Sequence, residues 1–168
     1  MNRAATSRLK LAASDAEDLQ ILSARLQDAV LKLGNVSWRP QKRRFAAVVN
    51  RLQWEAGGQT RVRAGLHFDG VLKVQSQNVK LGADEAVVSL LAVTFTPNEG
   101  EDPGGVIELV LAGGGAFRLT VECIEAELSD MTSAWAAAGR PDHEGPAAGR
   151  PNHEGPAKKT PDHQSEKA

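Results

Sequence analysis

The sequence predicts a mostly β protein of the α+β class, an antiparallel sheet with a helix at each end of the folded domain. Apolar and polar residues alternate in successive short segments, which is the pattern of half-buried strands. Turn residues, such as Asp69-Gly70 and the three glycines at 113–115, separate these segments. A helical spacing of leucines occurs near the N-terminus.

The first predicted element is a helix over residues 15–27. Ser14 is expected to cap it, and Glu17, three residues later, completes a capping box. Leu19, Leu22 and Leu26 then lie on one helical face. Residues 28–38 fit either a continuation of this helix or a strand that begins near Val30.

Three alternating segments follow. Residues 44–55 are expected to form a strand whose inward phase is Ala46, Val48, Leu52 and Trp54. Residues 62–68 form the next strand, and the turn at residues 69–71 predicts a hairpin that pairs Phe68 with Leu72 and Leu66 with Val74. Residues 86–97 are apolar on both phases, which favours a central strand covered on both faces.

The strongest local pattern runs from residue 105 to residue 128. Apolar residues alternate on both sides of the three glycines, so a hairpin centred there pairs Leu111 with Phe117, Leu109 with Leu119, and Ile107 with Val121. A slip of one residue would turn this apolar set to water. Cys123 continues the inward phase, and a β-bulge is expected beside it, because the alternation then moves one residue out of step.

A short helix is expected to end the domain, capped by Ser129 or Asp130, with Met131 and Trp135 four residues apart. The order is therefore a helix, six or seven antiparallel strands in a meander, and a final helix. This order resembles a pleckstrin-homology-like roll, or partly closed barrel, plugged by the final helix. A twisted open sheet with both helices on one face is the alternative.

Composition changes after residue 138, which predicts a single globular domain over residues 1–138. Residues 139–168 repeat a ten-residue Pro/Gly/His unit and contain no Leu, Ile, Val or aromatic residue. Such a segment cannot offset its ordering entropy by burial, so we expect a disordered tail. The single cysteine, and the lack of an apolar run at the N-terminus or of membrane length, favour a cytoplasmic protein that does not enter the membrane.

Charge is divided along the chain. Residues 1–80 contain 14 Lys and Arg against 6 Asp and Glu, a net charge of +8, and residues 81–139 contain one Arg against 10 acids, a net charge of −9. We expect a basic face that binds a protein partner or a small anionic ligand, against the alternative that the two halves simply attract each other across the fold. The residues of this expected surface are Arg39, Lys42, Arg43, Arg44, Arg61, Arg63 and His67.

Catalytic and nucleic-acid functions find less support. The glycines at 113–115 lie between two strands, so they form a hairpin loop and not a phosphate cradle. His67 is the only histidine of the expected domain, and the sequence contains no GxSxG, HExxH or paired-cysteine motif. The aromatic residues share phases with aliphatic ones, so none is expected to stack on bases. We therefore expect no cofactor and no metal.

Several segments together resemble a bacterial family of small proteins, domain-of-unknown-function family 2948. They include LKLAASDAEDLQILSARLQDAVLKLG, WRPQKRRFAAVVNRLQWE, LHFDGVLKVQS and GGGAFRLTVECIEAELSDMTSAW, and they span about residues 8–138. The resemblance implies a small stand-alone protein with no assigned activity or site. The sequence thus favours a non-catalytic interaction module. The alternative is a small enzyme or ligand-binding protein with a pocket inside the roll around His67; the oligomeric state stays open.

Overall fold

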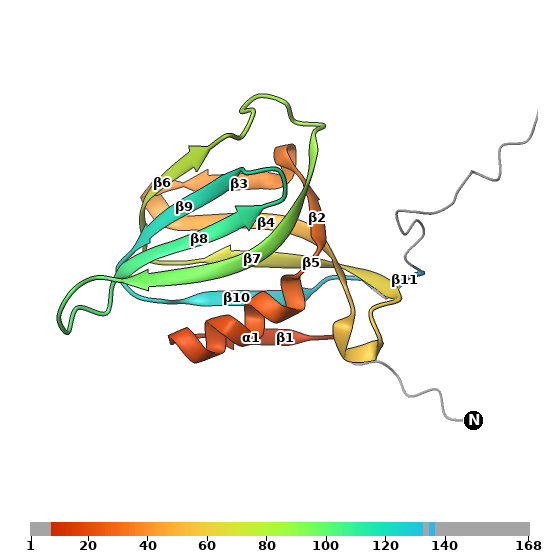
Figure 1. Ribbon diagram of the computed structural model, residues 1–168, viewed down its shortest axis with the longest axis horizontal. Helices are drawn as coiled ribbons and strands as arrows, with labels where there is room; N and C mark the ends of the chain where they lie inside the picture. The colour runs from red at the N-terminus through yellow and green to blue at the C-terminus, as the bar shows by residue number, and fades with distance from the viewer. Residues whose placement is uncertain (1–7, 133–134, 137–168) are drawn as a thin grey trace, which may run out of the picture. The chain divides into compact units, whose positions relative to one another are not determined.

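The computed structural model describes residues 8–132 and 135–136, and these residues form one bent antiparallel sheet with one α-helix (Figure 1). The helix, α1, spans Ala16–Leu26. The strands are β1 (Lys10–Ala13), β2 (Ala29–Lys32), β3 (Val36–Arg39), β4 (Arg44–Leu52), β5 (Thr60–Phe68), β6 (Val71–Gln77), β7 (Val87–Pro97), β8 (Gly105–Leu111), β9 (Ala116–Val121), β10 (Ala126–Asp130) and β11 (Trp135–Ala136). Three short 3₁₀ turns lie at Leu33–Asn35 (η1), Pro40–Lys42 (η2) and Trp54–Ala56 (η3).

The prediction of a mostly β chain is confirmed, but six or seven strands in a meander is wrong. The sheet of the described residues has 11 strands in the order β1-β10-β5-β4-β2-β7-β8-β9-β6, with β11 paired to β5 and β3 paired to β4. Neighbours in this order are often distant in sequence. The sheet does not close, because its path ends at β1 and β6.

The two halves of the sheet face each other across the core. Phe45 of β4 lies 5.5 Å, ring centre to ring centre, from Phe117 of β9, which belongs to the opposite half. Helix α1 buries Leu19, Leu22 and Leu26, as predicted, and packs against β1, β4 and β7. Beyond the first residue of β2, which pairs with Leu90, the Ser23 hydroxyl accepts a hydrogen bond from Val93 N at 2.9 Å, so α1 lies along the edge of β7 that β2 leaves free.

The N-cap of α1 is Asp15 and not Ser14. The Asp15 carboxylate accepts from Asp18 N at 2.8 Å, and the Asp18 carboxylate accepts in turn from Ser14 N at 3.2 Å. This is a variant of the capping box, because the Asp18 carboxylate bonds the residue before the N-cap and not the N-cap itself. Of the two possibilities for residues 28–38, the strand is correct: the helix ends at Gln27, Asp28 takes a left-handed conformation (φ 64°), and β2 and β3 follow.

Two strand predictions are wrong, one in the buried phase of the strand and one in the pairing. The buried phase of β4 is Phe45, Ala47, Val49 and Arg51, opposite to the expected one, and Trp54 lies in η3 with 38% exposure. The hairpin of residues 62–74 does not form, because β5 pairs with β4 and β10 while β6 pairs with β9. Strand β7 is central, as predicted, but it is not covered on both faces: Val87 and Leu91 are exposed, and Leu91 lies at a register shift between Leu90 and Ala92.

The β8–β9 hairpin has the predicted phase and a different register. Ile107 faces Leu119 and Leu109 faces Phe117, two residues away from the predicted pairing. The loop is tight because Gly113 and Gly114 adopt positive φ, and it closes with Leu111 N donating to Gly115 O at 2.9 Å. A shift of two residues keeps every side chain on its face, so the apolar set is still buried.

The end of the domain also differs from the prediction. No bulge continues β9: the strand ends at Val121, a bend containing the half-buried Cys123 follows, and Ala126–Asp130 becomes β10, paired with β1 and β5. Ser129 and Asp130, the expected caps of a final helix, lie in this strand, and residues 135–136 pair with β5. The final helix is therefore wrong for the described residues, and the predicted tail lies outside them.

Candidate functional site

Four basic residues that are close in sequence, Arg39, Lys42, Arg43 and Arg44, lie at the turn from β3 to β4. Pro40 occupies the first turn of η2, where its missing N–H costs nothing, and Arg43 N closes the turn on Pro40 O at 3.0 Å. Arg43 is left-handed (φ 51°), so the chain reverses direction there and enters β4. This turn brings Arg39, at the end of β3, opposite Arg44 at the start of β4.

Two of the four cations have acidic partners. Arg43 contacts Glu122 at 2.7 Å, and Arg44 holds the Asp69 carboxylate with two hydrogen bonds of 2.7 and 3.1 Å. The hydrogen bonds to Asp69 raise the pKa of Arg44 against the smaller effect of burial, and the same contact lowers the pKa of Asp69. Exposed pairs of this kind contribute about 0.2–1 kcal/mol, so they fix geometry more than stability.

Arg39 and Lys42 have no ion-pair partner among residues 8–132. Both lie on the rim of a hollow of about 470 Å³ on the outer face of the sheet, which we call the basic hollow. Its floor is low because Ala46 and Gly65 carry little or no side chain. The hollow is lined by Asn35, Ser37, Arg39, Lys42, Arg44, Ala46, Ala47, Val48, Gly65, Leu66, His67, Ser129 and Met131.

His67 lies on the outer face of β5, in the phase that the sequence predicts. Its Nε2 atom is 3.5 Å from Oδ2 of Asp69, the carboxylate that also holds Arg44. Its cross-strand neighbours are Ala46 and Glu127. His67 is therefore part of the rim of the basic hollow and does not face the core of the bent sheet.

The other two predicted residues lie away from the basic hollow. Arg61 donates to the backbone oxygen of Asn50 at 3.0 Å, and burial lowers the pKa of its guanidinium. Arg63 contacts the Asn50 side chain at 3.5 Å and lines an adjoining hollow of about 550 Å³ with Lys32 and Glu85; Asn35 and Val48 line both hollows. The seven predicted residues thus divide between two places, with Arg39, Lys42, Arg44 and His67 at the basic hollow and Arg43 beside it.

The two charged halves of the sequence interleave in the fold. Lys32 pairs with Glu85, Arg43 with Glu122, and Arg51 with Asp130, so three ion pairs join the basic half to the acidic half. Acidic strand β10 also lies directly beside β5. This pairing neutralises part of the basic surface. Arg39 and Lys42 have no such acidic partner among the described residues.

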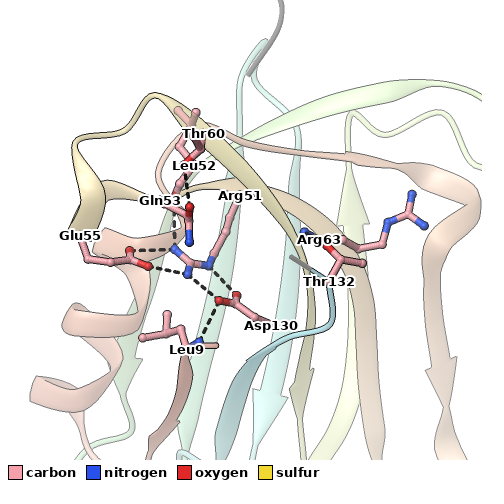
Figure 2. Close-up of polar contacts among 9 residues, drawn as sticks. All are labelled: Leu9, Arg51, Leu52, Gln53, Glu55, Thr60, Arg63, Asp130 and Thr132. Atoms are coloured by element: carbon pink, nitrogen blue, oxygen red, sulfur yellow. Dashed lines mark hydrogen bonds and ion pairs between the residues drawn. The ribbon is translucent and has the colours of Figure 1, made fainter. Parts of the chain in front are cut away.

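Sequence reasoning missed a buried ionic cluster around Arg51 (Figure 2). The Arg51 side chain is 0% exposed, and its five N–H groups all find acceptors on Asp130, Glu55 and the Leu52 carbonyl at 2.8–3.1 Å. Asp130, whose side chain is 1% exposed, also accepts from Leu9 N at 2.9 Å. Burial alone would lower the pKa of Arg51, but the hydrogen bonds from both carboxylates raise it.

The Arg51 cluster joins four segments of the fold, namely β4, η3, β10 and the chain just before β1. Bidentate Arg–carboxylate pairs of this geometry are strong and directional. The sequence did contain a signal, because Arg51 continues the phase of Phe45, Ala47 and Val49. Every polar atom of the guanidinium is engaged, so this cluster is structural and presents no free group to a ligand.

The fold and the site define a small, mostly β protein with a basic hollow on its outer face. Among residues 8–132 no group of three or more His, Cys, Asp and Glu side chains could hold a metal ion. No helix in the described part of the chain is long and apolar enough to cross a membrane. The chain belongs to the family described as Protein of unknown function (DUF2948), which matches residues 9–143.

Other comparisons give no match. Neither a curated protein nor a solved structure is significantly similar to this chain. The family match begins one residue after the predicted start and reaches His143, five residues past the predicted end of the similarity.

Proposed function

We propose that this protein is a non-catalytic interaction module that binds an anionic group, carried by a protein partner or a small ligand, through the basic hollow. The observation that carries the proposal is that Arg39 and Lys42 line a hollow and form no ion pair with an acid of residues 8–132. Unpaired cations that border a hollow attract an anion and can reach it from more than one side.

Arg44 and His67 play a different part in this proposal. Asp69 forms two hydrogen bonds with Arg44, which set the position of Arg44 before a ligand arrives, and it lies 3.5 Å from His67. Preorganised side chains lose less conformational entropy on binding. The small side chain of Ala46 lets a flat or branched anion approach the sheet closely, beside the Met131 side chain that covers Gly65.

Binding is favoured over catalysis by the chemistry of the rim. His67 and Asp69 are neighbours, but no hydroxyl or thiol hydrogen-bonds to His67 within the described residues, so a nucleophile–base pair is absent there. The alternative, a pocket inside the roll around His67, places His67 on the wrong face, since its side chain points outward. In this proposal the protein is cytoplasmic. Its bent sheet forms a partly closed roll, and α1 packs against the core of that roll.

The test compares two double variants with the same net charge. Arg39→Ser/Lys42→Ser removes the free cations of the hollow. Lys73→Ser/Lys80→Ser removes two exposed lysines that line no part of it. Each protein is titrated with inorganic pyrophosphate and with a short poly-glutamate peptide, and amide chemical shifts are followed by NMR.

We expect saturable shifts at β3, η2 and β4 that disappear in the first variant and persist in the second. Binding should weaken between about 50 and 200 mM salt, because exposed charges are screened over about 10 Å at 0.1 M. Binding of the peptide alone would assign a protein partner, and binding of pyrophosphate would assign a small anion. Equal losses in the two variants would show that only the overall charge matters, and the proposal would be wrong.

A further inference from the structure

A third concavity lies on the other side of β3 from the basic hollow, where the sheet fails to close. Strand β3 pairs with β4 and strand β6 pairs with β9, and neither pairs with the other in the described structure. In Figure 1 the two strands lie near each other at the upper left. Between them is a cleft of about 340 Å³, the apolar cleft, which falls in the usual range of small-molecule pockets, about 300–1,000 Å³.

The apolar cleft reaches the core. Phe45 and Phe117, whose rings contact each other across the two halves of the sheet, both line it. Its lining consists of Leu33, Val36, Trp38, Phe45, Val74, Ser76, Val79, Leu81, Gly82, Asp84 and Phe117. Aromatic and aliphatic side chains with a few polar groups are the usual composition of a ligand pocket.

The rim of the apolar cleft is anchored to the sheet. The chain between β6 and β7 passes over the opening, and two backbone hydrogen bonds of 2.9 Å tie its end down: Leu33 N donates to Ala86 O, and Gly34 N donates to Asp84 O. Gly34 is required at this contact, because a Cβ there would lie 2.9 Å from Cβ of Asp84. On the same rim Leu81 is 75% exposed, an apolar side chain that a bound ligand would cover.

Charge in the apolar cleft has the opposite sign to charge in the basic hollow. Asp84 is the one ionisable residue of its lining, which contains no Lys, Arg or His. Asp84 has no ion-pair partner among residues 8–132, since nearby Lys32 pairs with Glu85. Lys32 and Arg63 share the neighbouring 550 Å³ hollow with Asp84 but do not line the apolar cleft, so within the cleft an anion would meet an unpaired carboxylate and a cation would be attracted to it.

We propose that the apolar cleft binds a small amphiphilic amine. Its aromatic or branched apolar group lies against Phe45, Phe117 and Trp38, and its protonated amine lies at Asp84. The apolar part gains from leaving water, and the Trp38 and Phe117 rings accommodate flat groups. This site is independent of the basic hollow, because the two lie on opposite faces of β3.

The test uses three probes that share a naphthalene ring and differ in charge: 2-(2-naphthyl)ethylamine, 2-(2-naphthyl)ethanol and 2-naphthylacetate. Affinity for the full-length protein is measured by isothermal titration calorimetry at low salt. We expect the amine to bind best, the alcohol about two- to fivefold more weakly, as for an exposed ion pair, and the acetate weakest. No binding by any probe, or binding of the acetate as tight as that of the amine, would overturn the proposal.

Matched variants locate the site. Val74→Phe should fill the cleft and abolish binding, while Leu72→Phe, at the exposed register shift of the same strand and outside the cleft, should bind like the wild type. Asp84→Asn should reduce the affinity of the amine to that of the alcohol, and Glu101→Gln, at an exposed acid that does not line the cleft, should not. Melting temperatures check that each variant folds. Should Val74→Phe fail to fold, Val79→Phe at the rim gives the same test, and unchanged binding in a folded filling variant would refute the site.

Discussion

Replacing Arg51 by methionine is the most direct test of how this fold is held together. Arg51 lies among apolar neighbours on the inner phase of β4, and its five N–H groups are all bonded. Methionine keeps an unbranched apolar stem but removes the charge. The Asp130 carboxylate, with a side chain only 1% exposed, then keeps a single donor, Leu9 N.

The expected cost follows from this geometry. Removing one partner of a buried ion pair costs about 3–5 kcal/mol, mainly because the other charge stays buried without compensation. Domains of this size unfold with about 5–15 kcal/mol, so Arg51→Met should lose a large fraction of the stability. Glu55 is partly exposed and can turn to water, so most of the penalty arises at Asp130.

Urea denaturation followed by circular dichroism measures this cost. Arg43→Met is the matched control, because its pair with Glu122 is exposed on both sides and should contribute under about 1 kcal/mol. The double variant Arg51→Met/Asp130→Leu should recover most of the loss, since apolar replacement of a whole buried pair is often neutral. If Arg51→Met costs no more than Arg43→Met, the cluster does not stabilise the fold and the reasoning is refuted.

Three further predictions concern the core, the pH dependence and the C-terminal segment. Leu119→Ala, at a fully buried position of β9, should cost about 2–5 kcal/mol in the free energy of unfolding, while Thr120→Ala on the other phase should cost under about 1 kcal/mol; similar costs would mean that both faces are covered. Hydrogen bonds from Arg51 lower the pKa of Glu55 in the folded state, so this contact stabilises the fold above the ordinary pKa of 4.5 and the stabilisation is lost as pH falls below it. In Glu55→Gln the free energy of unfolding should therefore fall less steeply between neutral and acid pH, and an unchanged fall would contradict the assignment. Truncation after Gly139 removes no Leu, Ile, Val or aromatic residue, so the melting temperature should stay within about two degrees; a larger fall would show that the segment stabilises the domain.

The sequence determined the features that depend on local periodicity. Leucines three and four residues apart placed α1, and strict alternation gave the inward phases of β5, β8 and β9. The outward positions of Arg61, Arg63 and His67 follow from the same alternation. In α1, β5 and β9 only one face or phase was strongly apolar, so burial could be assigned without knowing the partner strand; in β8 Glu108 marks the outer phase between Val106 and Val110.

The tertiary structure decided everything that depends on a distant partner. Residues 46–49 of β4 are apolar on both phases, so its orientation was fixed by Arg51, which turns inward because Asp130 meets it from 79 residues away. Strand β6 pairs with β9 and not with the adjacent β5, and residues expected to form a final helix became β10. The basic hollow also depends on distant partners. Glu122 pairs with Arg43 and Asp69 pairs with Arg44, whereas Arg39 and Lys42 have no such partner among residues 8–132. The charge pattern along the sequence does not predict which of these four cations are paired.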